Sequence, residues 1–279
     1  MNETPWFVPA VAGLFGAVVG SFLNVVIHRL PAGESIVFPG SHCPRCGAPI
    51  RPWDNVPVLG WLALRGRCRD CREPISPRYP LVELANALLW AALALRFDPG
   101  LHLLAMAAFC SALLAITMID VDHWIIPDAI TLPGIFVGLA ASFAAPPRES
   151  LLADLMHESL GLGRLPGPLG APAFWDSLAA LLLGGGLFYL VAVLSRGGMG
   201  GGDIKLTAMM GAFLGLRDLG VAVFLALVVG SAVGIALMVA GRKTRKDLIP
   251  FGPFLALGGV IAVFWARPLV GGYLRLRGF

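Results

Sequence analysis

Acidic side chains stand at two places where long apolar stretches of the sequence end. The stretch ITMIDVDHWIIPDAITLPG, residues 116–134, brings Asp120, Asp122 and Asp128 close together. In the stretch GGMGGGDIKL, residues 197–206, Asp203 follows a run of glycine and opens another apolar segment. A carboxylate within a membrane is energetically costly, so each of these acids is a candidate for function. Two aspartates that reach one water can share a proton, one serving as base and the other as acid.

A simpler alternative is that these acids cap helices in solvated turns. Capping is common for an aspartate at a helix start, which suits Asp128 after Pro127 and also Asp203. The glycine run lets extended backbone come close to the residue that follows it. It is not a phosphate-binding loop of the P-loop type, because GxxxxGK[ST] is absent and no strand is predicted before it.

Four of the five cysteines form two CxxC pairs in one polar segment. The pairs read CPRCGAPI and CRDCREPI and supply Cys43, Cys46, Cys68 and Cys71. Two such pairs suit one tetrahedral zinc ion, and a segment too short to bury a core would gain folding free energy from the metal. The alternatives are two disulfides or a redox-active CxxC pair. Four sulfur ligands leave no open position on the metal, so we predict a structural zinc.

The elements that carry these residues are predicted to be membrane-spanning helices. Of the 279 residues, 57% are hydrophobic and 14% are charged, and the mean hydropathy is +0.79. Such a composition excludes an ordinary soluble domain and indicates an all-α polytopic membrane protein. We expect about eight transmembrane helices, over residues 6–27, 81–95, 101–119, 129–145, 174–194, 204–216, 219–240 and 251–266.

Charge placement predicts how these helices thread the membrane. No positive residue precedes the first span and Arg29 follows it, so the segment is not a cleavable signal peptide and the N-terminus is expected outside. With eight spans, fourteen Lys and Arg residues fall on the cytoplasmic side and seven outside. The predicted parts are a first helix (1–28), a cytoplasmic zinc-ribbon-like domain (29–79) and a transmembrane core (80–279). The core includes an external loop (146–173) with an interfacial helix at 149–160, and a basic loop (242–247) near anionic lipid headgroups. No internal repeat is evident.

Together these motifs resemble bacterial prepilin peptidases, also called type 4 prepilin leader peptidases. The resemblance covers nearly the whole chain and rests on five stretches in the family's order. They are GSFLNVVIHRLP (20–31), the paired CxxC (43–71), RYPLVELANALLW (78–90), IDVDHWIIPDAITLP (119–133) and GMGGGDIKLTAMMGAFLG (198–215).

The resemblance implies a GxGD-type intramembrane aspartyl peptidase without a catalytic metal. The aspartate of GxGD is Asp203, and its catalytic partner is Asp120, eight residues before the aspartate of the I-P-D element. Spacing alone leaves Asp120 and Asp122 equally eligible as that partner. The neighbouring motif residues are expected to support the pair: Gly200, Gly202, Asp122, Pro127, Asp128 and Lys205.

The implied reaction is removal of a short basic leader from type IV prepilins or type II secretion pseudopilins. Cleavage falls after a glycine on the cytoplasmic side of the bacterial inner membrane. Many members then N-methylate the new N-terminus with S-adenosylmethionine, although no dinucleotide-type glycine fingerprint supports that step here. Glu83 and Asn86 share a helix face, either as helix-packing groups or as contacts for substrate or methyl transfer.

Two other classes of protein compete with a peptidase. One is a membrane thiol–disulfide redox protein with reactive CxxC pairs, and the other is an ion transporter that uses the acids as ligands. The four-ligand cysteine set argues against the first, and the position of the acids at the membrane edge argues against the second. The expected partners are pilin-type substrates and membrane lipids, without nucleic acid.

Overall fold

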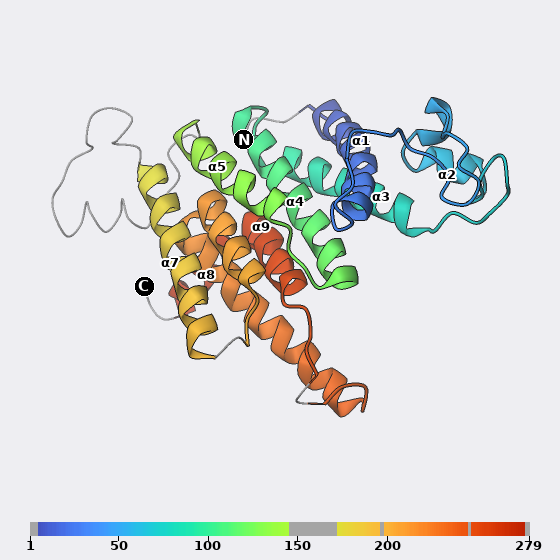
Figure 1. Cartoon of the computed structure of the whole chain (residues 1–279). Helices are drawn as coiled ribbons and strands as arrows, with labels where there is room; N and C mark the ends of the chain where they lie inside the picture. The colour runs from blue at the N-terminus through green and yellow to red at the C-terminus, as the bar shows by residue number, and fades with distance from the viewer. Residues whose placement is uncertain (1–4, 145–171, 196–197, 245–246, 277–279) are drawn as a thin grey trace. The chain divides into compact units, whose positions relative to one another are not determined.

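The structure, a computed structural model, describes residues 5–144, 172–195, 198–244 and 247–276 (Figure 1). Its regular elements in these ranges are helices and two isolated β-bridges, which confirms the all-α prediction. The helices are α1 (Phe7–Arg29), η1 (Pro52–Asn55), α2 (Leu59–Ala63), α3 (Arg78–Arg96), α4 (Leu101–His123), α5 (Asp128–Ala144), α7 (Pro172–Leu194), α8 (Gly201–Val239) and α9 (Gly252–Leu276). The chain forms two compact units, residues 1–119 and 120–279, and the boundary falls within α4.

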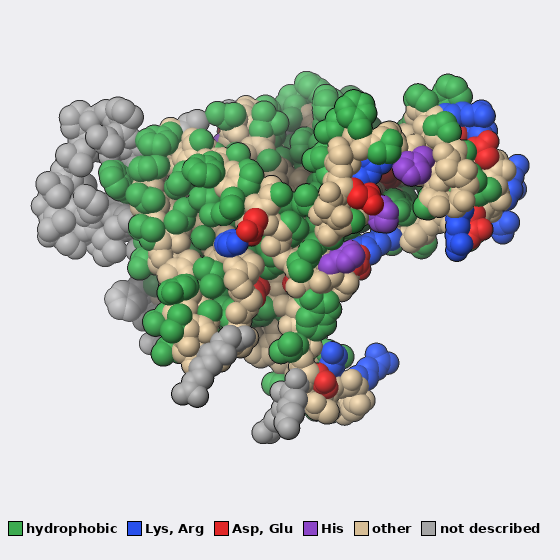
Figure 2. Space-filling model, viewed as in Figure 1, with side chains coloured by type: hydrophobic (Ala, Val, Ile, Leu, Met, Phe, Trp, Pro, Cys, Tyr) green, Lys and Arg blue, Asp and Glu red, His purple; other side chains and the backbone are tan. Residues whose placement is uncertain are grey.

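Several of these helices are apolar enough to cross a bilayer, so the chain is a multi-pass membrane protein. In the described part of the chain, five helices combine sufficient length with sufficient hydropathy: α1, α4, α7, α8 and α9. Helix α5 is apolar but shorter, and α3 carries the polar Glu83 and Asn86 in its first half. On the visible helical surface in Figure 2, hydrophobic side chains are numerous and charged side chains are few, as lipid-facing helices require. The count of eight spans stays a prediction, and the expected helix at 149–160 lies outside the described residues.

Helix α8 is too long to be one straight span. Its 39 residues would extend about 58 Å at about 1.5 Å per residue, nearly twice the hydrocarbon thickness of about 30 Å. Gly215 interrupts it with φ 78° and ψ 176°. The N–H of Leu216 donates to Oδ2 of Asp176 on α7 at 3.2 Å, so a backbone group at the break is satisfied. The break at Gly215 lies at the end of the first of the two apolar segments predicted at 204–216 and 219–240.

In the first unit, small residues and one polar network hold the helices together. Gly20 of α1 lies so close to α3 that an added Cβ would come within 2.7 Å of the Cα of Glu83. Asn86 is fully buried and donates to the carbonyl of Gly16 at 2.7 Å. The hydroxyl of Ser111 on α4 donates to Oδ1 of Asn86 at 2.8 Å, and Trp90 Nε1 donates to that hydroxyl at 2.9 Å. Such bonds contribute about 1 kcal/mol each between membrane helices.

In the second unit, α8 packs against α5, α7 and α9 (Figure 1). Glycines permit the close approach: a Cβ on Gly211 would lie 2.6 Å from the backbone of Ala180 on α7, and one on Gly138 of α5 would lie 2.9 Å from Ala212. Small-residue contacts of this kind replace the hydrophobic effect as the driving force for packing within lipid.

The end of α9 differs from the prediction. The predicted span ends at residue 266, before Pro268, whereas the helix continues through this proline to Leu276. A proline removes one backbone hydrogen bond, and membrane helices tolerate that loss when neighbouring groups satisfy the freed carbonyl.

Candidate active site and metal centre

Asp120 lies at the C-terminal end of α4 and is only 5% exposed. Its Oδ2 accepts a buried hydrogen bond of 3.1 Å from the N–H of Gly252, the first residue of α9. The helix closes directly after it, because the N–H of Trp124 donates to the carbonyl of Asp120 at 3.0 Å and Trp124 adopts φ 60°. Asp122 is exposed. The structure therefore distinguishes two aspartates that sequence spacing leaves equivalent.

Asp203 lies in the first turn of α8 and is half-buried. Its N–H donates to the carbonyl of Gly200 at 3.2 Å, so the end of the glycine run forms the turn into the helix. The carboxyl groups of Asp120 and Asp203 lie close enough to interact electrostatically. That these two acids form one catalytic pair stays a prediction.

Ile126 is the residue around which the helix ends assemble. A Cβ added to Gly202 would lie 2.7 Å from the Cβ of Ile126, and one added to Gly252 would lie 3.2 Å from its Cδ1. The isoleucine side chain thus occupies a niche between the first turns of α8 and α9. Sequence reasoning did not select Ile126 or Gly252. The segment IPFGPF, residues 249–254, carries a signal for the second of these, since a glycine between prolines opens an apolar span.

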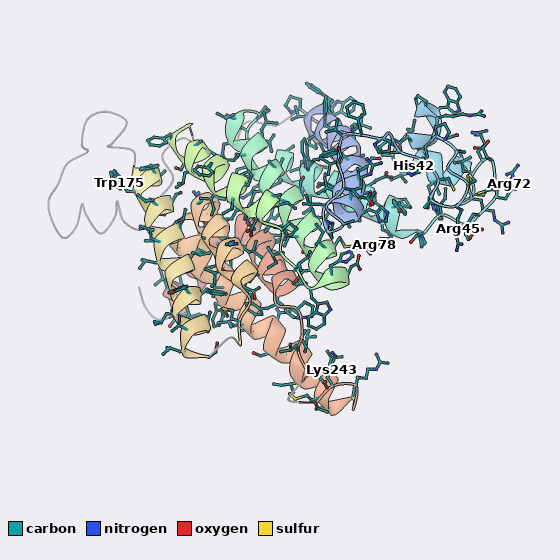
Figure 3. All side chains as sticks on the ribbon, viewed as in Figure 1. His42, Arg45, Arg72, Arg78, Trp175 and Lys243 are labelled. Atoms are coloured by element: carbon teal, nitrogen blue, oxygen red, sulfur yellow. The ribbon has the colours of Figure 1, made fainter. Side chains whose placement is uncertain are left out.

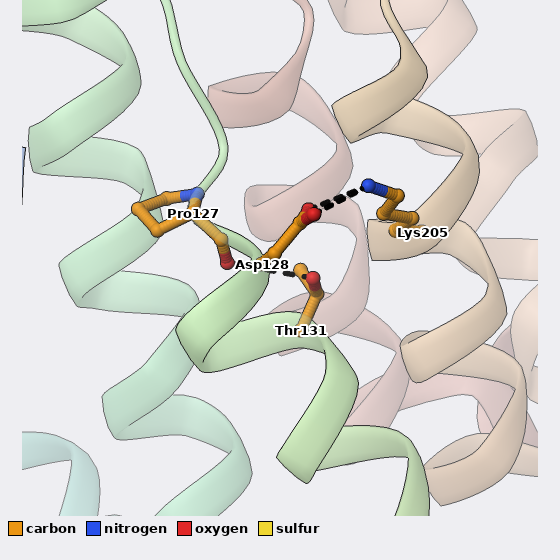
Figure 4. Close-up of polar contacts among 4 residues, drawn as sticks. All are labelled: Pro127, Asp128, Thr131 and Lys205. Carbon is orange, nitrogen blue, oxygen red and sulfur yellow. Dashed lines mark hydrogen bonds and ion pairs between the residues drawn. The ribbon is translucent and has the colours of Figure 1, made fainter.

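Asp128 and Lys205 form an ion pair beside this niche (Figure 4). Lys205 Nζ lies 2.7 Å from Oδ1 and 2.6 Å from Oδ2 of Asp128. Asp128 is the first residue of α5, and the N–H and hydroxyl of Thr131 both donate to the carbonyl of Pro127 in the same turn. The ion pair joins the start of α5 to the start of α8. Both side chains are about half exposed, so its stabilisation is of the order of 0–1 kcal/mol.

The four cysteines of the CxxC pairs come together as predicted. Their sulfur atoms all lie within 4.8 Å of one another, and the Sγ atoms of Cys43 and Cys71 are 3.8 Å apart. A tetrahedral ion with bonds of about 2.3 Å to sulfur separates its ligands by about 3.8 Å, so this group can hold a metal ion. The backbone N–H groups of Cys46 and Arg45 lower the pKa of the Cys43 thiol to about 6.

The two CxxC turns have the same backbone structure. Each first cysteine donates its N–H to the carbonyl five residues later, and its own carbonyl accepts from the residue four positions later. That later residue is Gly47 in one turn and Arg72 in the other, and both have positive φ. An isolated β-bridge flanks each turn, His42 with Pro49 and Arg67 with Pro74. The similarity of CPRCGAPI and CRDCREPI was therefore a structural repeat that the sequence analysis missed.

Glu83 and Asn86 lie in helix-packing positions. Oε2 of Glu83 accepts from the N–H of Val58 at 2.7 Å, which ties the polar segment to α3, and Val58 has the unusual φ of 60° for a β-branched residue. Asn86 is occupied by the network with Gly16 and Ser111. Of the two roles considered for these residues, their contacts favour packing. Nearby, Arg29 is buried and its guanidinium donates to three carbonyls of the segment that follows α1.

Fold and site define a class: a multi-pass helical membrane protein with an aspartate at the end of α4, another at the start of α8, and a separate group of four cysteines. Comparison with known proteins identifies the family. Residues 14–97 match the bacterial peptidase A24 N-terminal domain, and residues 107–235 match the type IV leader peptidase family. The chain belongs to the type IV leader peptidase family.

Curated relatives match over almost their whole length. A prepilin leader peptidase/N-methyltransferase of Aeromonas hydrophila is 37% identical, with 97% of this chain and 95% of the relative covered. Proteins of the same name from Burkholderia pseudomallei (strain 1026b) and Pseudomonas aeruginosa are 40% and 38% identical. The first alignment covers 96% of this chain and 88% of the relative, and the second covers 95% and 93%. No solved structure gives a significant match.

Proposed function

We propose that this protein removes the leader peptide of type IV prepilins or type II secretion pseudopilins and then N-methylates the new N-terminus. The observation that supports the proposal is the position of Asp120 at the end of α4 and of Asp203 at the start of α8, with Ile126 against the glycine beside each of them, in a member of the type IV leader peptidase family. The matched relatives are named for the same two activities, peptidase and N-methyltransferase.

Hydrolysis would use the two aspartates and one water. One carboxylate takes a proton from the water, whose oxygen forms a bond to the carbonyl carbon of the scissile peptide. The other carboxyl group donates its proton to that carbonyl oxygen. The tetrahedral intermediate then breaks its C–N bond: the leaving nitrogen takes the proton held by the first aspartate, and a hydroxyl group of the intermediate gives its proton to the second. The products are a new carboxyl terminus and a new amino terminus, and the aspartates together again hold one proton.

We assign supporting roles to the residues around this pair. Asp128 and Lys205 join α5 to α8, and Gly202 leaves space for Ile126. Gly200 accepts the hydrogen bond that forms the turn before Asp203, while Pro127 ends the loop that separates α4 from α5. Asp122 is the exposed neighbour of Asp120.

We assign a structural zinc ion to Cys43, Cys46, Cys68 and Cys71. Zinc would supply folding free energy to the polar segment at residues 29–79. Four sulfur ligands would fill the coordination sphere of the ion and leave no position for a reacting water. The methyl donor would be S-adenosylmethionine, and we expect that activity to depend on the same segment. No residues are assigned to the donor, because the sequence lacks a glycine fingerprint for it.

The proposed location is the bacterial inner membrane with the N-terminus outside. Residues 29–79 and 242–247 would face the cytoplasm, where the leader of a prepilin is found, and 146–173 would face outside. Lys243 lies on the loop after α8 (Figure 3). We expect the Lys and Arg residues of the basic stretch 242–246 to bind anionic lipid headgroups. We expect lipids and pilin-type substrates as partners, without nucleic acid.

The test is incubation of the purified protein with a prepilin, followed by mass analysis of the product. Cleavage after the leader's glycine, and an added methyl group only when S-adenosylmethionine is present, are the expected results. An uncut prepilin would contradict the proposal. Coupled thiol oxidation or ion flux in the same preparation would instead favour the redox protein or the transporter.

A further inference from the structure

The first residue of α9 belongs to the candidate active site, although α9 carries neither aspartate. We propose that Gly252 is a positioning residue: its N–H holds Oδ2 of Asp120, and its missing side chain leaves room for that carboxyl group. The inference rests on the peptidase function proposed above.

The first argument comes from the hydrogen bond. The first N–H groups of a helix have no partner within the helix and need an acceptor from elsewhere. Gly252 finds that acceptor in Asp120, 132 positions earlier in the chain, and the bond of 3.1 Å is buried. A buried N–H and a buried carboxyl group that satisfy each other fix the rotamer of the side chain and the position of the helix start.

The hydrogen bond also separates the roles of the two carboxyl oxygens. An oxygen that accepts from an N–H is the less favoured of the two carboxyl oxygens to carry a proton, because the bond occupies one of its lone pairs. When the carboxyl group of Asp120 is protonated, the bond from Gly252 to Oδ2 therefore favours the proton on Oδ1. Gly252 in this way biases the position of the proton on Asp120.

The second argument is steric. A Cβ on Gly252 would lie 2.6 Å from Oδ2 of Asp120, closer than real Cβ atoms approach other atoms. It would also lie 3.2 Å from Cγ of Asp120 and 3.2 Å from Cδ1 of Ile126, which are tight contacts on two sides. An alanine must therefore displace the carboxyl group. Gly271, in the same helix, has nothing within 4 Å of an added Cβ and provides a matched control.

The kinetic test compares Gly252→Ala with Gly271→Ala in the full-length protein with a prepilin substrate. A displacement of about 1 Å in a reacting group lowers rates about a hundredfold. We therefore expect Gly252→Ala to lower kcat by about that factor and to leave KM within about twofold, because the role proposed for Gly252 is to position Asp120 and not to bind the leader. Gly271→Ala should cleave like the wild type. A Gly252→Ala protein with wild-type kcat would overturn the inference.

A second measurement leaves Gly252 in place, so it does not depend on whether the alanine variant folds. The sequence has two Phe–Gly pairs, Phe15–Gly16 and Phe251–Gly252. Protein labelled with 13C on phenylalanine carbonyls and 15N on glycine therefore gives two selectively detected amide signals. Asp120→Asn should shift one of them, that of Gly252, whereas Asp122→Asn should shift neither.

The two measurements separate the inference from the function on which it rests. If neither amide signal shifts in Asp120→Asn, the contact between Gly252 and Asp120 is refuted, even if prepilin is cleaved normally. If the wild-type protein leaves prepilin uncut but the Gly252 signal shifts in Asp120→Asn, the peptidase function is refuted. The contact between Gly252 and Asp120 still holds in that case.

Discussion

At the scale of single residues, the strongest prediction concerns the carboxyl groups of Asp120 and Asp203, because the proposed mechanism requires both to exchange protons. An Asp→Asn change keeps the size of the side chain and removes its ability to exchange a proton. Because acid–base catalysis contributes about 10²–10⁴-fold, Asp120→Asn and Asp203→Asn should each lower cleavage at least about a hundredfold. The double variant should be no worse than either single variant, since the two act as one unit. Cleavage of a prepilin, followed by gel mobility or mass, measures this.

The neighbouring aspartates supply the controls for that experiment. Asp122→Asn and Asp128→Asn should retain much more activity, because one is exposed and the other forms an ion pair with Lys205. All variants should keep normal membrane insertion and metal content. If Asp122→Asn abolished cleavage and Asp120→Asn retained it, the partner of Asp203 would be Asp122. The two-aspartate mechanism itself would still hold. Substantial cleavage by Asp203→Asn would remove the mechanism itself.

The glycines of the GxGD motif should respond unequally to alanine. A Cβ on Gly201 meets nothing within 4 Å, whereas one on Gly202 would lie 2.7 Å from Ile126. Gly201→Ala should therefore leave activity within about twofold and Gly202→Ala should lower it tenfold or more, since small misplacements of catalytic groups are costly. Both lie in the first turn of α8, so a general effect of alanine on helix stability would act on both alike. Equal activities would argue against the niche.

At the scale of elements, the two CxxC turns should depend on one shared ion. Cys46→Ser removes one of four ligands, so bound zinc should fall and residues 29–79 should become sensitive to limited proteolysis. The helices of the second unit should stay protease-resistant. Metal analysis and digestion of the purified membrane protein measure both effects. Wild-type protein without zinc, with freely titrating thiols, would contradict the assignment.

The Asp54–Arg69 ion pair gives this element a defined pH dependence. Arg69, between the cysteines of the second turn, donates from Nε to Asp54 at 2.8 Å and lowers the pKa of that carboxyl group. Because the pKa of Asp54 is lower in the folded than in the unfolded state, the ion pair stabilises the folded segment at pH values above the unfolded-state pKa of about 3.9. This stabilisation is lost as the pH falls through the folded-state pKa of Asp54. Asp54→Asn should therefore release zinc to a chelator faster than wild type at pH 7. The two rates should converge in strong acid, and a constant ratio would exclude the ion pair as the cause.

Much of the element scale was predictable because its signals are local. Apolar runs indicated the positions of the helices, and the two CxxC pairs indicated the group of four cysteines, since each depends on residues near one another in sequence. Spacing could not separate Asp120 from Asp122, because burial is set by α9 and α8, far along the chain. Ile126 and Gly252 were missed for the same reason: their role is shape complementarity between helix ends. The extension of α9 through Pro268 was missed because local propensity disfavours proline within a helix.

At the scale of the whole molecule, the threading through the membrane is the open prediction. Single cysteines introduced into a variant without Cys110 can be labelled from outside with an impermeant thiol reagent in intact cells. Positions in 146–173 should react, and positions in 242–247 should react only after the cells are opened. The expectation follows from the excess of Lys and Arg on the side proposed to be cytoplasmic. Strong labelling of 242–247 in intact cells would reverse the orientation.

The contact between Gly252 and Asp120 has a consequence for biogenesis. Translation makes α4, α5 and α8 before α9, so both aspartates are inserted into the membrane while the donor that orients one of them is still absent. A nascent chain that has reached only the loop after α8 therefore has both acids and an unfinished site. The enzyme would then become active only after α9, which carries Gly252, has been inserted into the bilayer.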